Sequence, residues 1–309
     1  MDTEYDLLVI GGGAAGLAAA QYGARANRRT LLVEAMAAGG QALLIDALEN
    51  YPGVKGPVSG YDISETMRVQ AESFGALFLT AGATALAKED GAFRVTTDEG
   101  ELRARAVILA TGAQHRHIDV PGEEELAGRG VSYCATCDGP FFKNRRMLVV
   151  GGGDAACDEA SFLSKLSDKI VLAHRRDRFR AQASLAERVL KDPRIEVRFG
   201  TVVKEIRGGK KVESVLLAGA QGEYEESFDA VFVFVGSIPQ SELAEGARKD
   251  EAGYVLADDR MATSVPGLFA AGDVRASPFR QLITAASDGA IAAHSASQYI
   301  DEIEGAAYV

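Results

Sequence analysis

One arrangement occurs twice along this chain and limits what it can fold into: an apolar run, a cluster of glycines and then small residues that favour a helix. The glycine clusters occupy residues 11–13 and 151–153. In both copies a second apolar run ends 23 positions after the first glycine, at Glu34 and at His174. Each copy therefore predicts a strand, a tight turn, a helix and a second strand, which is typical of the α/β class.

The glycine turns suit the pyrophosphate of a dinucleotide, because glycine lets the backbone approach phosphates at the positive end of the following helix. Glu34 can accept hydrogen bonds from a ribose diol and disfavours a 2′-phosphate, which predicts FAD or NAD at the first site. The second copy has His174, Arg175 and Arg176 at the matching place. Guanidinium groups bind phosphate through charge-assisted bonds, so the second site is predicted to prefer NADP(H). A solvated basic loop is the alternative for the two arginines, and the matched spacing favours the binding site.

Two further apolar runs end in small residues, as expected where a strand end lies close to a cofactor or another backbone. One run leads into Thr111 and Gly112, and the other contains Asp273. Asp273 could accept hydrogen bonds from the ribityl chain of a flavin, or it could cap the final helix.

The order of the motifs predicts that the second dinucleotide-binding domain is inserted into the first. Proline, glycine and charged residues interrupt the apolar periodicity near residues 115–121 and 235–245. Residues 196–228 alternate between apolar and polar and predict a β-meander in the inserted domain. The expected domains are residues 1–117 (FAD-binding, first part), 118–244 (NADPH-binding, with the cysteine pair described below) and 245–309 (FAD-binding, second part).

Composition narrows the class of protein. The 309 residues include 33 Lys and Arg against 44 Asp and Glu, which gives a net charge of −11. Such a charge repels nucleic-acid backbones and anionic lipid, so neither is expected as a partner. No apolar run approaches the ~20 residues of a membrane-spanning helix, and the acidic start does not resemble a secretory signal. Three cysteines make a poor disulfide framework and fit a cytoplasmic redox protein.

Two of the cysteines, Cys134 and Cys137, have the spacing at which thiols form a small disulfide and reopen it by exchange. Asp138 follows directly and is a candidate proton donor or acceptor. Half of a zinc site is the competing interpretation, but a structural zinc site needs four ligands, and the histidines form no pair at metal spacing. Cys157 is expected to be a small buried residue of the second helix.

The first glycine fingerprint, the Cys-Ala-Thr-Cys-Asp segment, the second fingerprint and the His-Arg-Arg segment resemble, in this order, the low-molecular-weight prokaryotic thioredoxin reductases. Further matching segments are residues 39–41, 49–53, 174–181 and 279–281, and the resemblance covers essentially the whole chain. It implies an α/β flavoprotein with two Rossmann-like domains, FAD and NADPH as cofactors, thioredoxin as partner and a homodimer in the cytoplasm. It also implies an NADPH domain that swings between reducing the flavin and exposing the dithiol.

The motifs and the resemblance together assign candidate residues to three sites. The candidates for binding FAD are Gly11, Gly12, Gly13, Ala14, Ala15, Gly16, Glu34, Gly40, Gln41, Asn50, Thr111, Gly112, Asp273, Arg280 and Gln281. The candidates for binding NADPH are Gly152, Gly153, Asp154, Ala155, Glu159, His174, Arg175, Arg176 and Arg180. The candidates for docking thioredoxin are Arg129, Phe141 and Phe142, within a cationic rim that also contains Lys143, Arg145 and Arg146. A place in the domain's own core is the alternative for Phe142.

By resemblance, Cys137 is the thiol next to the flavin, Asp138 manages its proton and Cys134 is the interchange thiol. The expected activity is hydride transfer from NADPH to FAD, electron transfer to the disulfide and exchange with oxidised thioredoxin. The alternatives are a dithiol oxidase or ferredoxin-fed reductase of the same fold, a redox sensor that binds NADPH, and a hydroperoxide-reductase flavoprotein. The chain departs from the family pattern in two segments, residues 157–158 and 287–289.

Overall fold

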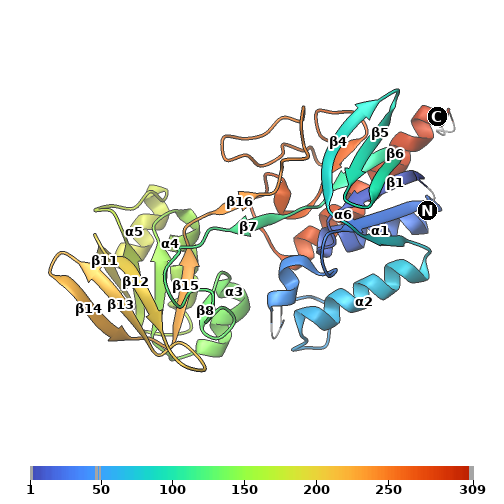
Figure 1. The fold of residues 1–309 in the computed structure, drawn as a ribbon. Helices are drawn as coiled ribbons and strands as arrows, with labels where there is room; N and C mark the ends of the chain where they lie inside the picture. Colours follow the sequence, from blue (N-terminus) through green and yellow to red (C-terminus); the bar gives the residue numbers. More distant parts are fainter. Residues whose placement is uncertain (1–2, 46–47, 49, 306–309) are drawn as a thin grey trace. The chain divides into compact units, whose positions relative to one another are not determined.

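The structure, a computed structural model, describes residues 3–45, 48 and 50–305. Glu49, which begins one of the matching segments, and the first two residues of the acidic start lie outside this part of the chain. The chain forms two compact units: residues 1–114 and 238–309 make up unit 1, and residues 115–237 make up unit 2 (Figure 1). None of the helices in the described ranges has both the length and the apolar character that a membrane span requires.

Unit 1 is built on a seven-stranded sheet. In spatial order its strands are β3 (Leu77–Thr80), β2 (Thr30–Glu34), β1 (Glu4–Ile10), β6 (Gly100–Leu109), β5 (Ala92–Thr97) and β4 (Ala83–Glu89), with β17 (Leu268–Ala270) paired to β6. The pairs β4–β5 and β5–β6 are antiparallel, and the other pairs are parallel. The sequences of β1 and β2 are largely apolar because a core cluster covers each face of the sheet.

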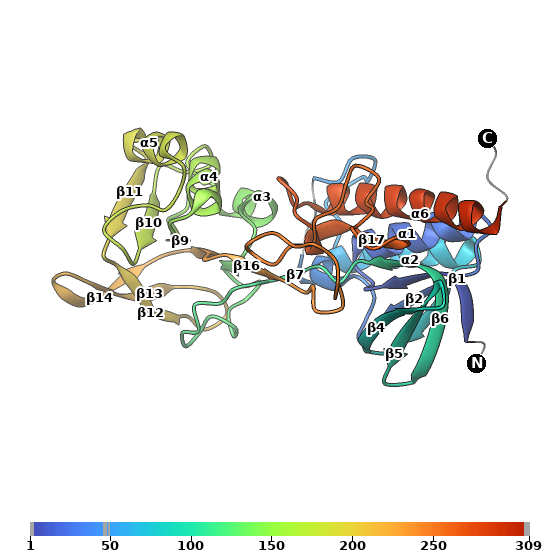
Figure 2. The ribbon, with the colours of Figure 1, turned by 90° about the horizontal axis from the view of Figure 1, so that it is seen from above.

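The helices of unit 1 include two that lie against each other. The helical elements in its described part are α1 (Ala14–Arg25), α2 (Gly60–Ser73), α6 (Leu282–Glu304) and the 3₁₀ turns η1 (Gly40–Leu44) and η3 (Gly272–Val274). Helices α1 and α6 lie side by side (Figure 2). Small residues allow this contact, since a Cβ added at Gly289 would lie 2.0 Å from the backbone oxygen of Ala15. Leu7, Leu17 and Ile108 belong to the core cluster on this side of the sheet.

Unit 2 contains a five-stranded parallel sheet and a separate three-stranded antiparallel sheet. The parallel strands are, in spatial order, β11 (Ile195–Phe199), β10 (Ile170–His174), β9 (Met147–Gly151), β15 (Ala230–Phe234) and β8 (Val131–Ser132). The antiparallel strands are β12 (Val202–Arg207), β13 (Ser214–Gly219) and β14 (Gly222–Ser227). The helical elements are α3 (Ala135–Asp138), η2 (Gly139–Phe142), α4 (Asp154–Leu163) and α5 (Ala183–Lys191). The predicted α/β class with parallel sheets is confirmed.

Two details differ from the expectations. The meander covers β12 to β14 only, because residues 195–199 pair with β10 as a further parallel strand. Both domain boundaries differ by a few residues: residues 238–244, expected in the inserted domain, belong to unit 1, and residues 115–117, expected in the FAD-binding domain, belong to unit 2. Ala244 is fully buried in a core cluster of unit 1, together with Leu8 and Val255. Where the chain passes between the units, β7 (Ala113–His115) pairs with β16 (Ser237–Pro239).

The contact between α1 and α6 predicts a large penalty for a methyl group at Gly289. The added Cβ would have to displace the Ala15 carbonyl, so Gly289→Ala should lower the free energy of unfolding by about 1–3 kcal/mol. Gly209→Ala is the control, since an added Cβ at Gly209 has no neighbour within 4 Å. Urea unfolding of both variants measures the difference, and equal stabilities would contradict the packing described here.

Candidate functional site

The two glycine turns are built alike at their first glycine. The backbone φ is +105° at Gly11 and +156° at Gly151, in a region that favours glycine. A Cβ added at Gly11 would lie 2.3 Å from the carbonyl oxygen of Ala110. A Cβ added at Gly151 would lie 2.4 Å from the carbonyl oxygen of Phe234. Both turns therefore pass against the end of the neighbouring strand so closely that no side chain fits.

The second glycine of each turn faces the residue at the end of the second strand. A Cβ added at Gly12 would lie 3.0 Å from the Glu34 side chain, and one added at Gly152 would lie 2.2 Å from the His174 ring. The equal spacing in the sequence thus places corresponding residues, Glu34 and His174, against the second glycine of each turn.

The third glycine of each turn, Gly13 or Gly153, faces open space, since an added Cβ would have no neighbour within 4 Å. Each is also the N-cap of its helix and makes no side-chain capping bond. The first N–H groups of α1 and α4 are thus available to an anion, which the helix dipole favours. Each turn fits a pyrophosphate, and the candidates in the first helical turn there are Ala14, Ala15, Gly16 and Ala155.

Glu34 ties the first turn together. Its Oε2 accepts a hydrogen bond from the N–H of Gly12 at 2.6 Å, and its Oε1 accepts one from the N–H of Met36 at 2.9 Å. Gly40 lies beside the open side of the turn, where an added Cβ would be 3.2 Å from the Cα of Gly13. The structure therefore brings Glu34 and Gly40 to the same turn, as the sequence analysis expects.

The strand end at Thr111 and Gly112 is held by a glutamine. The Nε2 of Gln240 donates to the Thr111 carbonyl at 2.8 Å, and its backbone N–H donates to the Gly112 carbonyl at 2.9 Å. Gln41 donates to the carbonyl of Ala113, one residue further along. Gln240 could not be identified from the sequence, because a single glutamine in a loop belongs to no motif.

The side chain of Arg280 contains a hydrogen-bond donor that is buried and has no partner among the described residues, here called an orphaned atom. Its guanidinium lies over the ring of Tyr254, 4.2 Å from the centroid, and its Nε is buried without a hydrogen-bond partner in the described part of the chain. A buried donor without a partner costs free energy, which a bound acceptor would recover. Nearby in sequence, Gln281 accepts a hydrogen bond from Asn50 at 3.1 Å. These residues fit a polar cofactor such as FAD.

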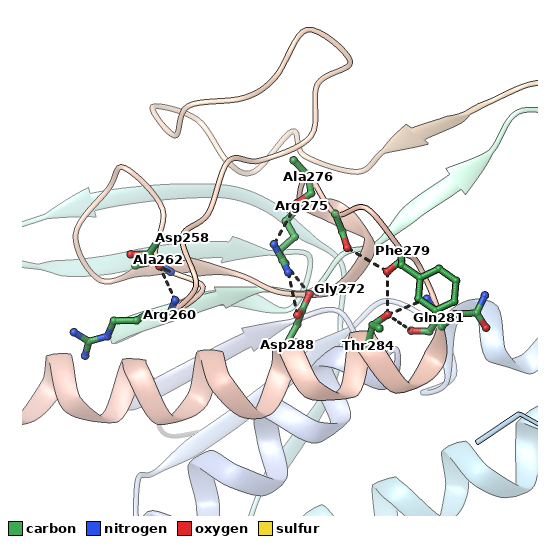
Figure 3. A network of polar contacts seen from close by, with 11 residues as sticks. Asp258, Arg260, Ala262, Gly272, Arg275, Ala276, Phe279, Gln281, Thr284 and Asp288 are labelled. Atoms are coloured by element: carbon green, nitrogen blue, oxygen red, sulfur yellow. Dashed lines mark hydrogen bonds and ion pairs between the residues drawn. The ribbon is translucent and has the colours of Figure 1, made fainter. Parts of the chain in front are cut away.

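Asp273 lies in the middle of η3 and not at the start of a long helix. Helix α6 begins at Leu282, where Gln281 and Thr284 form a capping box (Figure 3), so the alternative role of Asp273 as the cap of the final helix is wrong. Burial raises the pKa of Asp273, the charge of Arg280 opposes this effect, and the charge of Asp288 adds to it.

A hollow of about 560 Å³ lies in unit 2 and is lined by residues 176–180. Three exposed arginines, Arg176, Arg178 and Arg180, belong to this lining. The N–H of Arg180 donates to the carbonyl of Gly152 at 2.7 Å, which holds the segment against the second glycine turn. Arg175 is exposed beside them. The concentration of cations fits a phosphate. Arg178 was not a candidate from the sequence, because neither the strand end nor the family's motif singles it out.

His174 differs from these arginines, because its side chain is buried. The residue is 7% exposed, and its ring stacks on Phe179 with 6.0 Å between centroids. Burial lowers the pKa of His174, hydrogen bonds with the backbone of Arg178 and Gly151 oppose this effect, and the charges of Arg176 and Arg175 add to it. Its Nε2 has no hydrogen-bond partner among the described residues. His174 therefore offers a ligand a neutral polar atom, while the arginines offer charge.

Two acidic candidates of the second site have different surroundings. The Oε2 of Glu159 is buried without a partner in the described ranges, and burial, with the charge of Asp158, raises its pKa to about 7. The carboxylate of Asp154 instead accepts two hydrogen bonds from Gln182, at 2.7 Å from its N–H and 3.0 Å from its Nε2. Asp154 thus braces the loop that follows Arg180.

Cys134 and Cys137 form a disulfide, with their Cα atoms 5.3 Å apart. Cys134 is the N-cap of the short helix α3, and its Sγ accepts a hydrogen bond from the N–H of Cys137 at 3.2 Å. An N–H directed at sulfur favours the thiolate over the thiol. Both cysteines are partly exposed, so the pair can take part in exchange.

Asp138 is held by a serine that the sequence analysis did not identify. The Oγ of Ser132 lies 2.6 Å from the Oδ2 of Asp138 and accepts the N–H of Cys134 at 3.1 Å. The same hydroxyl therefore contacts both the carboxylate and the start of the disulfide segment. This contact could not be foreseen, because it depends on how β8 ends.

The residue before the disulfide is anchored as well. The hydroxyl of Tyr133 contacts Oε1 of Glu123 at 3.0 Å and Nδ1 of His117 at 2.9 Å. Glu123 is 2% exposed and also accepts the N–H groups of Ile118 and Asp119. Burial, and then Glu123, raise the pKa of Tyr133, so its hydroxyl stays protonated.

The two phenylalanines after the disulfide point to different surroundings. Phe141 is 49% exposed, whereas Phe142 packs edge-on against Phe232 with 6.1 Å between centroids.

Arg129 is exposed and donates to the carbonyl of Glu125. The rim is less cationic than its sequence suggests, because two of its members form ion pairs: Arg145 with Asp229 at 3.8 Å and Arg146 with Glu226.

Known proteins resemble this chain over almost its full length. Residues 5–290 match the family of pyridine nucleotide-disulphide oxidoreductases. The chain is 55% identical to a thioredoxin reductase of Treponema pallidum, over 98% of this chain and 100% of the relative. A solved thioredoxin reductase from Streptococcus pyogenes is 39% identical, with a TM-score of 0.91 over 98% of this chain and 100% of that one. A ferredoxin-flavin thioredoxin reductase from Clostridium acetobutylicum is 30% identical, with a TM-score of 0.55 over 98% and 99% of the chains.

These matches confirm the resemblance that the motifs indicate. Membership of this family implies a flavin and a pyridine nucleotide as cofactors. The Cys134–Cys137 pair fits the redox-active disulfide of the family. The chain belongs to the pyridine nucleotide-disulphide oxidoreductases and, within them, to the thioredoxin reductase family of flavoprotein disulfide oxidoreductases.

Proposed function

We propose that this chain reduces thioredoxin with electrons from NADPH, which pass through FAD and the Cys134–Cys137 disulfide. The observation that carries the proposal is the disulfide itself, which lies in the same unit as a glycine turn flanked by exposed arginines. When bound, FAD would accept a hydride and pass on two electrons, which no side chain of the chain can do. A homodimer and a cytoplasmic location remain predictions of the family resemblance.

The FAD site of the proposal is the first glycine turn with its surroundings in unit 1. The open side of Gly13, the uncapped start of α1 and the orphaned Nε of Arg280 support it. The residues proposed to hold FAD are those named from the sequence: 11–16, Glu34, Gly40, Gln41, Asn50, Thr111, Gly112, Asp273, Arg280 and Gln281.

The NADPH site of the proposal is the second glycine turn with the arginines at residues 175–180. The hollow beside Arg176 and Arg180 supports a phosphorylated ribose, and the orphaned atoms of Glu159 and His174 support a polar ligand. A donor such as ferredoxin, which one similar protein carries in its name, would need neither the turn nor the cations. Reduction by NADPH is therefore favoured over that alternative.

The two cysteines have different roles in the proposal. Cys134 attacks the disulfide of thioredoxin, because the N–H of Cys137 stabilises a thiolate at its Sγ. Before this attack, electrons from a bound flavin would reach Cys137 and open the Cys134–Cys137 disulfide, which frees Cys134. Cys137 would then attack the mixed disulfide, so that thioredoxin leaves as a dithiol and the Cys134–Cys137 disulfide re-forms. Asp138, held by Ser132 at 2.6 Å, is placed within the same short segment to give or take the proton of the released thiol.

The preference for NADPH over NADH tests the proposed role of Arg175 and Arg176 in binding the phosphate. Arg175→Ala or Arg176→Ala should raise the KM for NADPH by about 10- to 100-fold and leave the KM for NADH nearly unchanged, because each charge-assisted bond to phosphate is worth roughly 1.5–3 kcal/mol. Stopped-flow reduction of the bound flavin by each nucleotide measures the effect. Arg207→Ala, which removes an arginine of the meander, should change neither value. Equal losses for NADPH and NADH would show that the pair is structural.

The cysteine roles predict two distinct single variants. Cys134→Ser should leave a thiolate next to oxidised flavin and give a long-wavelength absorption band. Cys137→Ser should lack this band and trap a single-cysteine thioredoxin as a mixed disulfide through Cys134, seen by mass spectrometry. Cys157→Ser is the control, since Cys157 is buried and its pKa is raised by burial to about 11. A band in Cys137→Ser instead would reverse the assignment.

Docking of thioredoxin is proposed to use Arg129 and Phe141, which are exposed near the disulfide segment. Arg129→Ala and Phe141→Ala should each lower kcat/KM for thioredoxin at least about fivefold, the loss typical of a contact that matters. Reduction of a small disulfide dye should not change. Leu190→Ala removes an equally exposed apolar side chain, 57% accessible on α5, and should have no effect. The docking proposal fails if thioredoxin kinetics are unaltered in both variants.

A further inference from the structure

Asp288 lies in one of the two segments that depart from the family pattern, and its side chain is buried. The residue is 7% exposed and lies on α6. Its carboxylate pairs with Arg275, at 2.7 Å between Oδ2 and Nε and 3.2 Å between Oδ1 and Nη2 (Figure 3). The Oδ2 also accepts the N–H of Gly272 at 3.2 Å. A bidentate, partly buried pair of this kind is rigid, and removing one partner leaves an unbalanced charge.

The contacts of Asp288 enclose the turn that carries Asp273. Gly272 begins the turn η3, and Arg275 follows its last residue. Both are fixed to the same carboxylate, so the backbone on either side of Asp273 is attached to α6. The guanidinium is itself held by the Ala276 carbonyl at 3.2 Å. The position of Asp273 therefore depends on Asp288, although no hydrogen bond joins the two side chains in the described contacts.

The same helix is locked against the first glycine turn. Gly289, the residue after Asp288, has no room for a Cβ next to Ala15, and a Cβ at Gly272 would lie 2.9 Å from the Ala15 Cβ. Asp288 therefore sits where α6, the η3 turn and the start of α1 meet. Any shift of its carboxylate would move the turn relative to the start of α1.

Charge adds a second link. The charges of Asp288 and Arg275 offset each other in their ion pair. The charge of Arg280 likewise acts on the half-buried carboxyl of Asp273, where it opposes the rise in pKa that burial causes. An imbalance among these four charges would change the reduction potential of a nearby cofactor, since the buried surroundings screen charges poorly.

We infer that Asp288, acting through Arg275 and the Gly272 N–H, is a positioning residue that holds Asp273 toward the flavin and keeps the local charge balanced for flavin reduction. The inference rests on the proposed FAD site. Asp288 itself does not touch the cofactor in this account. Its role concerns flavin affinity and potential, and not the exchange chemistry of the disulfide.

The test compares Asp288→Asn with the charge-balanced double variant Arg275→Gln/Asp288→Asn. The single variant leaves Arg275 unpaired, so the flavin potential, measured by equilibration with a reference dye, should move upward and the FAD dissociation constant should rise about tenfold. The double variant should return the potential toward that of the wild type. A purely structural defect would persist in the double variant, so the reversal separates the two explanations.

Asp301→Asn is the matched control, because Asp301 forms an ion pair with Arg28 at 2.5 Å near the other end of α6. It should leave potential and FAD affinity unchanged. Should Asp288→Asn not fold, Arg275→Gln, which leaves the Asp288 carboxylate without its cationic partner, should move the potential downward.

An unchanged potential and FAD affinity in Asp288→Asn, or a shift that the double variant keeps, would overturn the inference. A wild-type chain that binds no FAD would instead overturn the proposed FAD site on which the inference rests. Measuring FAD binding by the wild type first therefore distinguishes the two failures.

Discussion

The close approach of each glycine turn to the backbone around it is the constraint on which the rest of the molecule depends. A Cβ at Gly16 would lie 1.8 Å from the carbonyl oxygen of Gly11, and a Cβ at Gly289 would lie 2.0 Å from that of Ala15. These contacts draw α1 onto the end of β1 and α6 onto α1. The third glycine is left facing open space, and the helix begins without a side-chain cap. The same packing that stabilises the unit thus creates the place for a phosphate.

Unit 2 repeats this construction with a different charge pattern. Glu34, at the end of β2, accepts hydrogen bonds from backbone N–H groups, whereas His174 ends β10 as a neutral ring and leaves charge to the arginines that follow. In a chain with a net charge of −11, this cationic stretch is a local exception. A phosphate is attracted there by nearby charges over a distance of about 10 Å, within which salt screens only partly.

Much of the fold and of the candidate site could be predicted from the sequence, because the tight turns require glycine at fixed spacings. The repeat at residues 11–13 and 151–153, the equal distance to Glu34 and His174, and the cysteine pair identified the elements and the family. Contacts between distant side chains were not accessible. Ser132 beside Asp138, Gln240 beside Thr111 and Arg275 beside Asp288 each depend on where a turn ends, and no local pattern specifies that. The second crossing lies within the interval 235–245 that the sequence indicated, but the domain boundary at residue 244 was placed too late, since the burial of Ala244 is decided by the core it joins.

In the proposed function, electrons from NADPH reach the Cys134–Cys137 disulfide through the flavin. Anaerobic addition of NADPH to the FAD-loaded chain, followed by alkylation of thiols and mass spectrometry, tests it most directly. If electrons follow this route, both cysteines become labelled only after NADPH is added. The wild type then consumes one equivalent more of NADPH than Cys134→Ser before the flavin is fully reduced. A flavin that NADPH reduces while Cys134 and Cys137 remain unlabelled would contradict this route.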